Sequence, residues 1–438
     1  MLGACRLDTS CCMNRSIERV SAPVQPGHTA GVSREAATRV LIGNAFAFNL
    51  GFYMVLPYLF SYMQADLAMQ AASIGLVLGI RVLSQQGLFL MGGWLGDLWG
   101  YRPTIIWGCA LRAAGFLMLG NSLNLYGLLL GAAFTGLAGA LFTPSSQAYL
   151  SLLHPDETRR RQVFVWHHWM SQAGMLLGPL VGLWAGTHGF RTTALVAGGL
   201  FGVFMLVQWR LLPAETALSG SAKQADVPSD PQAGAWRGLL RHRTFWLFSL
   251  WSGGYSILFQ QLYLAVPAHL QAQQTGAAPV THLFTLTAVF SIALQWPASR
   301  YLAPLLGTAR AMGMGLMLMG LAYGSLLVLE PGRLAVVSMV FALLFSAGSV
   351  LVYPLINSEV ARYAPSVSRA RYYGLLAGVG GLMSLIGNML VGAALDRSPH
   401  GPEAGLWWVL CACGVGSGVL LWRHVHQQSV GFLATKAV

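Results

Sequence analysis

The sequence is poor in charged residues and almost lacks lysine. Only 9% of its 438 residues are charged, and Lys223 and Lys436 are the only lysines. A soluble domain usually carries about 25% charged residues. Since 55% of the chain is hydrophobic, it has too few polar side chains to cover a water-soluble surface. The composition excludes a soluble domain and favours an all-α membrane protein.

Motifs for catalysis, metal binding and phosphate binding are also missing. The sequence contains no Gly-x-Ser-x-Gly, no His-Glu-x-x-His and no glycine-rich phosphate loop, so we expect neither an enzyme nor a bound cofactor or metal. None of the six cysteines forms a Cys-x-x-Cys pair. The net charge of +12 comes from arginines between apolar runs, a pattern typical of membrane proteins rather than of nucleic-acid binding.

Apolar runs of about 20 residues, long enough to cross a bilayer as helices, recur along the chain. Twelve lie near residues 40–62, 73–95, 103–121, 124–150, 162–186, 190–212, 244–268, 280–302, 309–328, 333–357, 371–394 and 404–423. They predict two six-helix halves, 39–212 and 244–424, joined by a polar cytoplasmic linker, 213–243. Residues 1–38 are expected to be a disordered cytoplasmic tail, and residues 425–438 a second cytoplasmic tail.

The distribution of basic residues predicts the orientation of the spans. If the N-terminus is cytoplasmic, the outer connections hold only Arg191, Arg333 and Arg397, and most of the 26 basic residues lie on the inner side. Inner loops of membrane proteins are enriched in Arg and Lys. Both termini are therefore expected in the cytoplasm.

The polar segment 92–103 lies between the second and third runs. Its glycines predict a tight turn between two helices, with Asp97 at the membrane edge facing Arg102 or a helix N-terminus. Gly93, Asp97, Gly100 and Arg102 match a loop motif of the major facilitator superfamily, Gly-x-x-x-Asp-Arg/Lys-x-Gly-x-Arg/Lys. Leu98 stands where that family usually has a basic residue.

A second motif lies in the fifth run. Gly174, Gly178, Pro179 and Gly182 are similar to the Gly-x-x-x-Gly-Pro-x-x-Gly pattern of the drug–proton antiporter branch of that superfamily. Small residues four apart let another helix pack closely, and the proline bends the helix. Segments 79–87 and 111–116 resemble the second and third spans of bacterial MdtH-type multidrug transporters.

This resemblance implies a monomeric transporter of the bacterial inner membrane. In such proteins the two halves rock about a central site, and small amphipathic compounds or drugs are exported, with a proton as a candidate counter-ion. The lipid bilayer and a small-molecule substrate are the implied partners.

Polar residues inside the runs are candidates for the site, since ionisable groups within a membrane are costly and often functional. Arg81 and Gln85 share a helix face and could hold a polar or anionic part of a substrate. The alternative is a structural arginine bonded to a neighbouring helix, the role that we favour for Arg112. His168 and Gln172 also share a face, where the histidine could carry a proton or belong to an interfacial aromatic belt.

The seventh and tenth runs carry a polar and aromatic series. Tyr255, Tyr263, Tyr353 and Asn357 are candidates to line a central cavity. Drug-binding cavities of the resembled family mix aromatic and polar groups in this way.

One departure bears on proton coupling. The MdtH-type pattern has acidic residues where this chain has Asn44, Ser171 and Tyr353. An antiporter needs a group within the membrane that exchanges a proton for substrate. Glu359 and His168 are the remaining candidates for that group. Otherwise the chain would be a facilitator or an organic-anion or metabolite carrier without proton coupling.

Overall fold

The computed structural model describes residues 28–154, 156–213, 241–272, 278–328, 334–363, 369–398 and 403–436. This part of the chain is helical apart from short connections and contains no strand. The all-α prediction is therefore confirmed.

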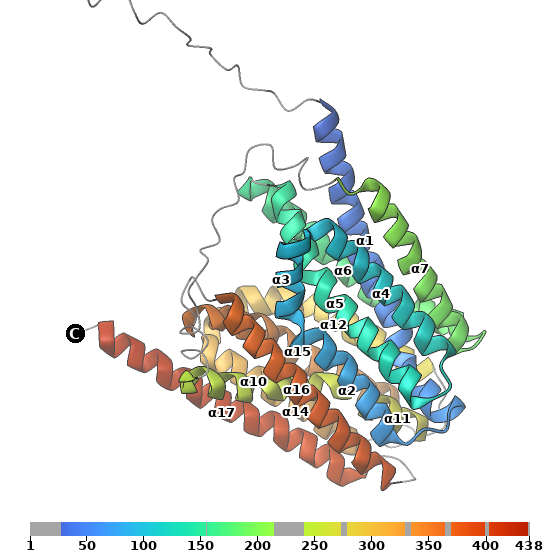
Figure 1. Ribbon diagram of the computed structural model, residues 1–438. Helices are drawn as coiled ribbons and strands as arrows, with labels where there is room; N and C mark the ends of the chain where they lie inside the picture. Colours follow the sequence, from blue (N-terminus) through green and yellow to red (C-terminus); the bar gives the residue numbers. More distant parts are fainter. Residues whose placement is uncertain are drawn as a thin grey trace, which may run out of the picture.

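Eight helical segments form the first half of the chain: α1 (His28–Ser61), the short π-helix η1 (Tyr62–Asp66), α2 (Ala71–Gly87), α3 (Phe89–Trp99), α4 (Tyr101–Asn121), α5 (Leu125–Leu153), α6 (Glu157–Gly186) and α7 (Phe190–Leu211). The second half contains α10 (Arg243–Gln261), α11 (Ala265–Ala272), α12 (Ala278–Pro297), η2 (Ala298–Leu302), α13 (Ala303–Leu306), α14 (Thr308–Ser325), η3 (Leu326–Val328), α15 (Leu334–Tyr363), α16 (Arg369–Asp396) and α17 (Ala404–Lys436). In Figure 1 the blue-to-green helices form one group and the yellow-to-red helices a second.

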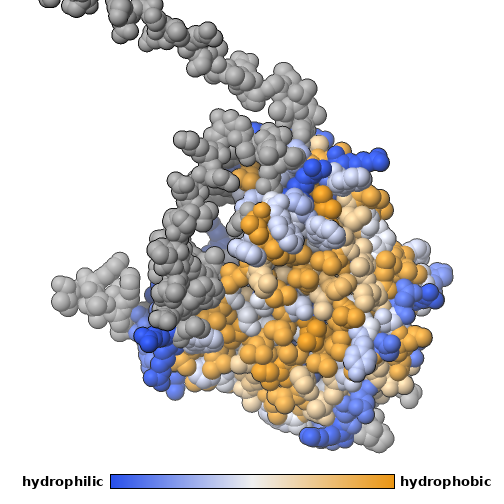
Figure 2. All heavy atoms as spheres, viewed as in Figure 1, coloured by the Kyte–Doolittle hydropathy of each residue, from blue (hydrophilic) through white to orange (hydrophobic). Residues whose placement is uncertain are grey.

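The twelve expected runs all fall on helices, although not all are equally apolar. Among the described residues, seven helices are long and apolar enough to cross a membrane, and α2 with α3 makes an eighth that bends by 44°. The other four expected runs, on α6, α10–α11, α12 and α14, are less apolar or interrupted. On the face shown in Figure 2, hydrophobic residues cover the middle of the molecule and hydrophilic residues gather at its margins, as a bilayer requires.

One expected element is wrong, and two helices extend into the expected tails. Segment 92–103 is not a long turn, because α3 continues to Trp99 and α4 begins at Tyr101. The turn is Gly100 alone, with φ of 93°, a conformation that glycine adopts without steric cost. Helix α1 begins at His28 within the expected N-terminal tail, and α17 continues to Lys436 through the expected C-terminal tail. Most of the linker, 214–240, lies outside the described residues.

Glycines allow α6 to pack directly against α1. A Cβ atom on Gly178 would lie 2.6 Å from Cβ of Tyr53, and Gly174 and Gly182 touch the backbone of α1 in the same way. The small-residue face expected on this helix is therefore used for helix packing. Gly79 likewise lets α2 approach Leu385 of α16, whose Cα would be 2.9 Å from an added Cβ, so a seam of this kind also joins the two halves.

Candidate functional site

Two polar residues of α2 contact each other inside the molecule. Arg81 is only 5% exposed, and its Nη1 donates a hydrogen bond to Oε1 of Gln85 at 3.3 Å. The two side chains that the sequence places on one face are thus in contact. Gln85 is half-buried, so one residue of the pair is buried and the other is partly accessible.

A second buried arginine, Arg112 of α4, lies among aromatic rings. Its Cζ is 3.5 Å from the ring centre of Phe48, and its Nη2 donates to the Thr135 carbonyl at 3.4 Å. Cation–π contact and a backbone acceptor fit the structural role expected for Arg112. Its Nε and Nη1, however, have no hydrogen-bond partner in the described part of the chain.

Both arginines lie beside the ring of Phe52. Their Cζ atoms lie 5.0 Å (Arg81) and 5.9 Å (Arg112) from the ring centre of Phe52. No ion pair joins either arginine to a described carboxylate. In a medium of low dielectric, two nearby positive charges create a strong local field. The first half therefore holds a positively charged centre.

Aromatic rings continue from this centre into the second half. Successive ring centres are 6.3 Å apart for Phe52 and Tyr263, 6.1 Å for Tyr263 and Phe259, 5.6 Å for Phe259 and Tyr255, and 5.7 Å for Tyr255 and Tyr353. Tyr263 is buried, whereas Tyr353 is 58% exposed. Three of the candidate tyrosines thus belong to one continuous row, which we call the aromatic row.

A buried amide pair lies near the aromatic row. Nε2 of Gln261 donates to Oδ1 of Asn388 at 3.1 Å, which links α10 to α16. Both residues have zero exposure, and Oε1 of Gln261 and Nδ2 of Asn388 have no partner among the described residues. Buried amide groups usually satisfy their hydrogen bonds, so this pair retains capacity for a further polar contact.

Asn44 lies elsewhere. It is fully buried, and its Nδ2 is 3.8 Å from Sγ of Cys109 on α4. The same sulfur accepts from Nε2 of Gln208 on α7 at 3.3 Å. These contacts hold three helices of the first half together. A role for Asn44 in substrate binding stays a prediction.

Three further candidates lie on α6 and α15. His168 is exposed between Trp166 and Trp169, which are 60% and 55% exposed, an arrangement typical of an interfacial aromatic belt. Gln172, one turn further, is half-buried. On α15, Asn357 donates to the Tyr353 carbonyl of its own helix at 2.8 Å.

Glu359 forms the one described ion pair with a buried carboxylate. It is 3% exposed, and its Oε1 accepts from Nη1 of Arg362 at 2.7 Å. A buried carboxylate is costly unless it is paired. Proton uptake by Glu359 would therefore weaken its contact with Arg362.

The expected loop motif is divided between two helices. Gly93 and Asp97 lie within α3, Gly100 is the turn, and Arg102 lies in the first turn of α4. Nη2 of Arg102 donates to the Trp209 carbonyl of α7 at 2.6 Å. The side chain of Asp97 lies outside the described part of the structure. Contacts of this motif with the facing half stay a prediction.

The opposite end of the molecule is closed by contacts between the halves. The carboxylate of Asp396, at the end of α16, accepts hydrogen bonds from the backbone N–H groups of Ala71 and Ala72 at the start of α2. The hydroxyl of Tyr58 on α1 contacts Oγ1 of Thr281 on α12. A helix N-terminus favours a negative charge. We call these contacts the Asp396 closure.

Sequence reasoning names neither Asp396 nor Tyr58 as a site residue. The available signal was the acidic residue Asp396 at the end of an apolar run. Which helix start it caps depends on how the halves pack, and no local pattern contains that information.

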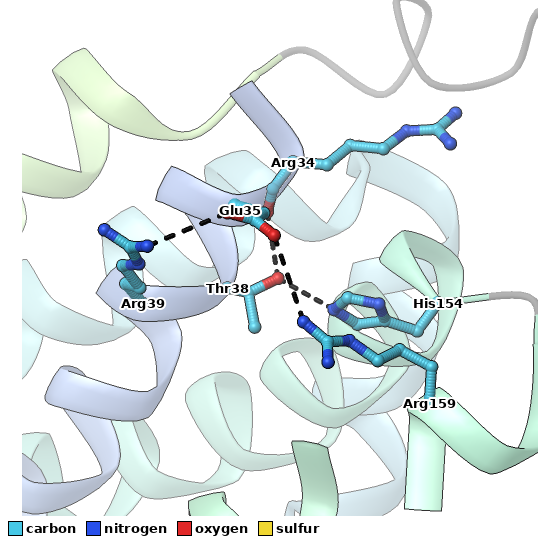
Figure 3. A network of polar contacts seen from close by, with 6 residues as sticks. All are labelled: Arg34, Glu35, Thr38, Arg39, His154 and Arg159. Atoms are coloured by element: carbon cyan, nitrogen blue, oxygen red, sulfur yellow. Dashed lines mark hydrogen bonds and ion pairs between the residues drawn. The ribbon is translucent and has the colours of Figure 1, made fainter. Parts of the chain in front are cut away.

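A polar network ties α1 to the connection between α5 and α6 (Figure 3). Oγ1 of Thr38 donates to the Arg34 carbonyl at 2.9 Å and contacts Nε2 of His154 at 2.8 Å. Glu35 lies 3.7 Å from Arg39 and 3.9 Å from Arg159. Burial and the nearby Arg159 and Arg34 lower the pKa of His154, while Glu35 opposes this shift.

Comparison with known proteins identifies the family of this fold. The family model for the Major Facilitator Superfamily matches residues 41–388. The chain belongs to this superfamily. It is therefore a multi-pass membrane protein of a transporter family, and the resemblance carried by the loop and helix motifs is confirmed.

Curated relatives cover most of the chain. An uncharacterized MFS-type transporter of Mycobacterium tuberculosis is 34% identical over 370 residues, covering 82% of this chain and 86% of the relative. The multidrug resistance protein MdtH of Aeromonas hydrophila is 30% identical over 384 residues, covering 86% of this chain and 93% of the relative. The superfamily member described here thus resembles multidrug resistance proteins along nearly its whole length.

Solved structures support the same architecture. A mutant of the nucleoside transporter NupG superimposes with a TM-score of 0.73 at 13% identity, covering 89% of this chain and 99% of its own. An auto inhibited POT family peptide transporter gives a TM-score of 0.71 at 18% identity, covering 89% and 96%. At these identities the likeness shows the fold alone.

Proposed function

We propose that this chain is a monomeric secondary transporter that exports small amphipathic compounds by alternating access. It would lie in the bacterial inner membrane with both termini in the cytoplasm. The relatives named for multidrug resistance support drug-like substrates, and the basic residues of the inner connections support the orientation.

The observation that carries the proposal is the contrast between the closed end of the molecule and the exposed far end of the aromatic row. The Asp396 closure joins the halves at one end, whereas Tyr353 is 58% exposed within the second half. A site that can be reached from one side only is what alternating access requires of each state. Passage to the other side would break the Asp396 closure and form new contacts at the opposite end.

A transport assay tests the proposal directly. The purified protein is reconstituted in liposomes and offered cationic, neutral and anionic compounds. Saturable movement of at least one compound, absent from protein-free liposomes, is expected. If no compound moves although the protein is folded, the transport proposal is wrong.

Proton coupling is tested in the same vesicles. Glu359 and His168 are the candidate coupling groups, so substrate addition should release protons in the wild type and fail to do so in Glu359→Gln or His168→Ala. Transport without proton movement would favour the second candidate function, a facilitator or organic-anion or metabolite carrier. The non-acidic residues Asn44, Ser171 and Tyr353, at positions where the resembled transporters carry acids, favour that alternative.

A further inference from the structure

We infer that Arg81, with Arg112 behind it, forms a subsite for the anionic group of an amphipathic organic substrate, whose apolar body lies along the aromatic row. The inference rests on the proposed transport function only in assuming that the bound compound is a transported substrate. Binding of the anionic group can be tested without transport.

The first argument is charge. Arg81 and Arg112 are 5% and 1% exposed and lie within 6 Å of the ring centre of Phe52. Among the described side chains, Glu359 is the only acidic one that is buried, and it is paired with Arg362. Buried charges without counter-ions are costly. An anion bound at Arg81 would offset that cost, whereas a cation would increase it.

The second argument is hydrogen-bonding capacity. Nε of Arg81 and Nε and Nη1 of Arg112 have no described partner although they are buried. The bond from Arg81 to Gln85 is long, at 3.3 Å, and uses one of the five donors of the guanidinium. A carboxylate or sulfonate accepts two parallel hydrogen bonds from such a group. The unsatisfied donors are therefore of the kind that an oxyanion takes up.

The third argument is access. Gln85, Phe259 and Tyr255 are half-buried, and Tyr353 at the far end of the aromatic row is 58% exposed. The rings along this row are 5.6–6.3 Å apart. An aromatic or aliphatic body can pack on ring faces while its anionic group reaches inward to Arg81. A row of rings that leads from an exposed tyrosine toward a buried arginine therefore matches the shape of an amphipathic anion.

The two arginines have different tasks. Arg112 is held by the rings of Phe48, Phe52 and Phe201 and by the Thr135 carbonyl. It strengthens the positive field from a fixed position. Arg81 lies one turn from the half-buried Gln85, so it is the arginine that contacts the anionic group. Replacing Arg81 should therefore weaken binding of the anionic group of the substrate and leave binding of its apolar body unchanged.

The experiment uses two probes of the same shape, 2-naphthoate and its neutral amide, 2-naphthamide. Their dissociation constants are measured by titration calorimetry on the full-length protein in detergent at pH 7.5. Variants are Arg81→Gln, Arg81→Lys and, as control, Arg300→Gln at an exposed arginine. Size-exclusion profiles and melting temperatures verify folding. Transport of both probes is measured separately in liposomes.

Wild type and Arg300→Gln should bind naphthoate about ten- to a hundredfold more tightly than naphthamide, the range expected for hydrogen bonds to a charged group. Arg81→Gln should reduce this preference to less than about threefold and leave naphthamide binding unchanged. Arg81→Lys should retain part of the preference, because it keeps the charge and loses the planar fork.

Equal binding of the two probes by the wild type would overturn the inference, as would binding of neither. Equal loss of both probes in folded Arg81→Gln would also overturn it, since Arg81 would then be structural. If Arg81→Gln does not fold, the inference is judged by two results: the preference of the wild type for naphthoate over naphthamide, and the partial loss of this preference in Arg81→Lys. Charge-selective binding without transport of any compound would support the subsite and contradict the proposed transport function.

Discussion

At the scale of single residues, His154 makes the stability of one helix junction depend on pH. The Thr38 hydroxyl donates to the Arg34 carbonyl, so its oxygen remains to accept a hydrogen bond from Nε2 of His154. Burial and the adjacent Arg159 and Arg34 lower the pKa of this histidine from 6.5. Below about pH 6.5, His154 therefore binds a proton less readily in the folded protein than in the unfolded chain.

The sign of the effect follows from this difference. As the pH falls through 6.5 toward the lower folded pKa, the unfolded state binds more protons, and the folded state loses stability relative to it. The melting temperature in detergent should fall between about pH 7.5 and pH 5.5. In His154→Gln the decrease should be smaller. His188→Gln, at an exposed histidine, should keep the wild-type profile, and identical profiles for all three proteins would contradict the prediction.

The buried arginines belong to this scale as well. A single-residue view assigns Arg81 to substrate binding or to helix packing with equal justification. Only its position beside Phe52 and Arg112 and the absence of a described carboxylate partner make anion binding the better hypothesis.

At the scale of elements, the contact between α1 and α6 depends on three glycines. A Cβ atom on Gly178 would lie 2.6 Å from Cβ of Tyr53 and 3.0 Å from the Leu50 carbonyl oxygen. Gly178→Ala should therefore force the helices apart and lower the free energy of unfolding by about 1–3 kcal/mol, as overpacking usually does. Thermal unfolding in detergent measures this loss.

Gly202→Ala is the matched control. Gly202 lies on α7, where an added Cβ meets nothing within 4 Å. The same substitution should be neutral or slightly stabilising there, because alanine favours helix more than glycine by about 1 kcal/mol. If both variants lose stability equally, the close approach of α1 and α6 is not the reason that glycine is required at position 178.

At the scale of the whole molecule, the Asp396 closure should set the balance between two states. The carboxylate accepts from the N–H groups of Ala71 and Ala72, and such a contact with a helix N-terminus contributes roughly 0.3–2 kcal/mol. Asp396→Asn should therefore increase the population that is open at this end, by up to about thirtyfold relative to the closed one.

Spin labels at positions 70 and 397, on either side of the closure, report this balance as a distance distribution. The variant should show a longer distance that is rare in the wild type. Asp66→Asn changes an exposed acid in the same region and should leave the distribution unchanged. An unaltered distribution in Asp396→Asn would mean that the closure is held by other contacts.

The loop motif at the other end gives a complementary prediction. If Asp97 and Arg102 stabilise the state closed at that end, Asp97→Asn should slow transport several-fold and change the dissociation constant of the substrate by less than about twofold. Transport rates in liposomes and binding in detergent provide the two measurements. Equal transport rates for wild type and Asp97→Asn would count against a gating role.

The fold was largely predictable, because spans are determined by length and apolarity. The apolar runs predict twelve helical regions, and all are helical in the structure. The long turn at 92–103 was wrong because the sequence between Phe89 and Trp99 lacks a helix breaker other than glycine, and packing of α3 against α5 lets it remain helical. Likewise, the shared face of Arg81 and Gln85 could be predicted, since it depends only on helical periodicity.

Hydropathy and short motifs are local properties, so the amino-acid sequence alone predicts a chain that crosses a membrane many times and belongs to a transporter superfamily. Tertiary packing sets which distant residues meet. It placed Asp396 at the start of α2, Tyr353 at the exposed end of the aromatic row, and two arginines beside one phenylalanine. These pairings depend on how helices far apart in the chain pack together, and single-helix periodicity contains no information about them.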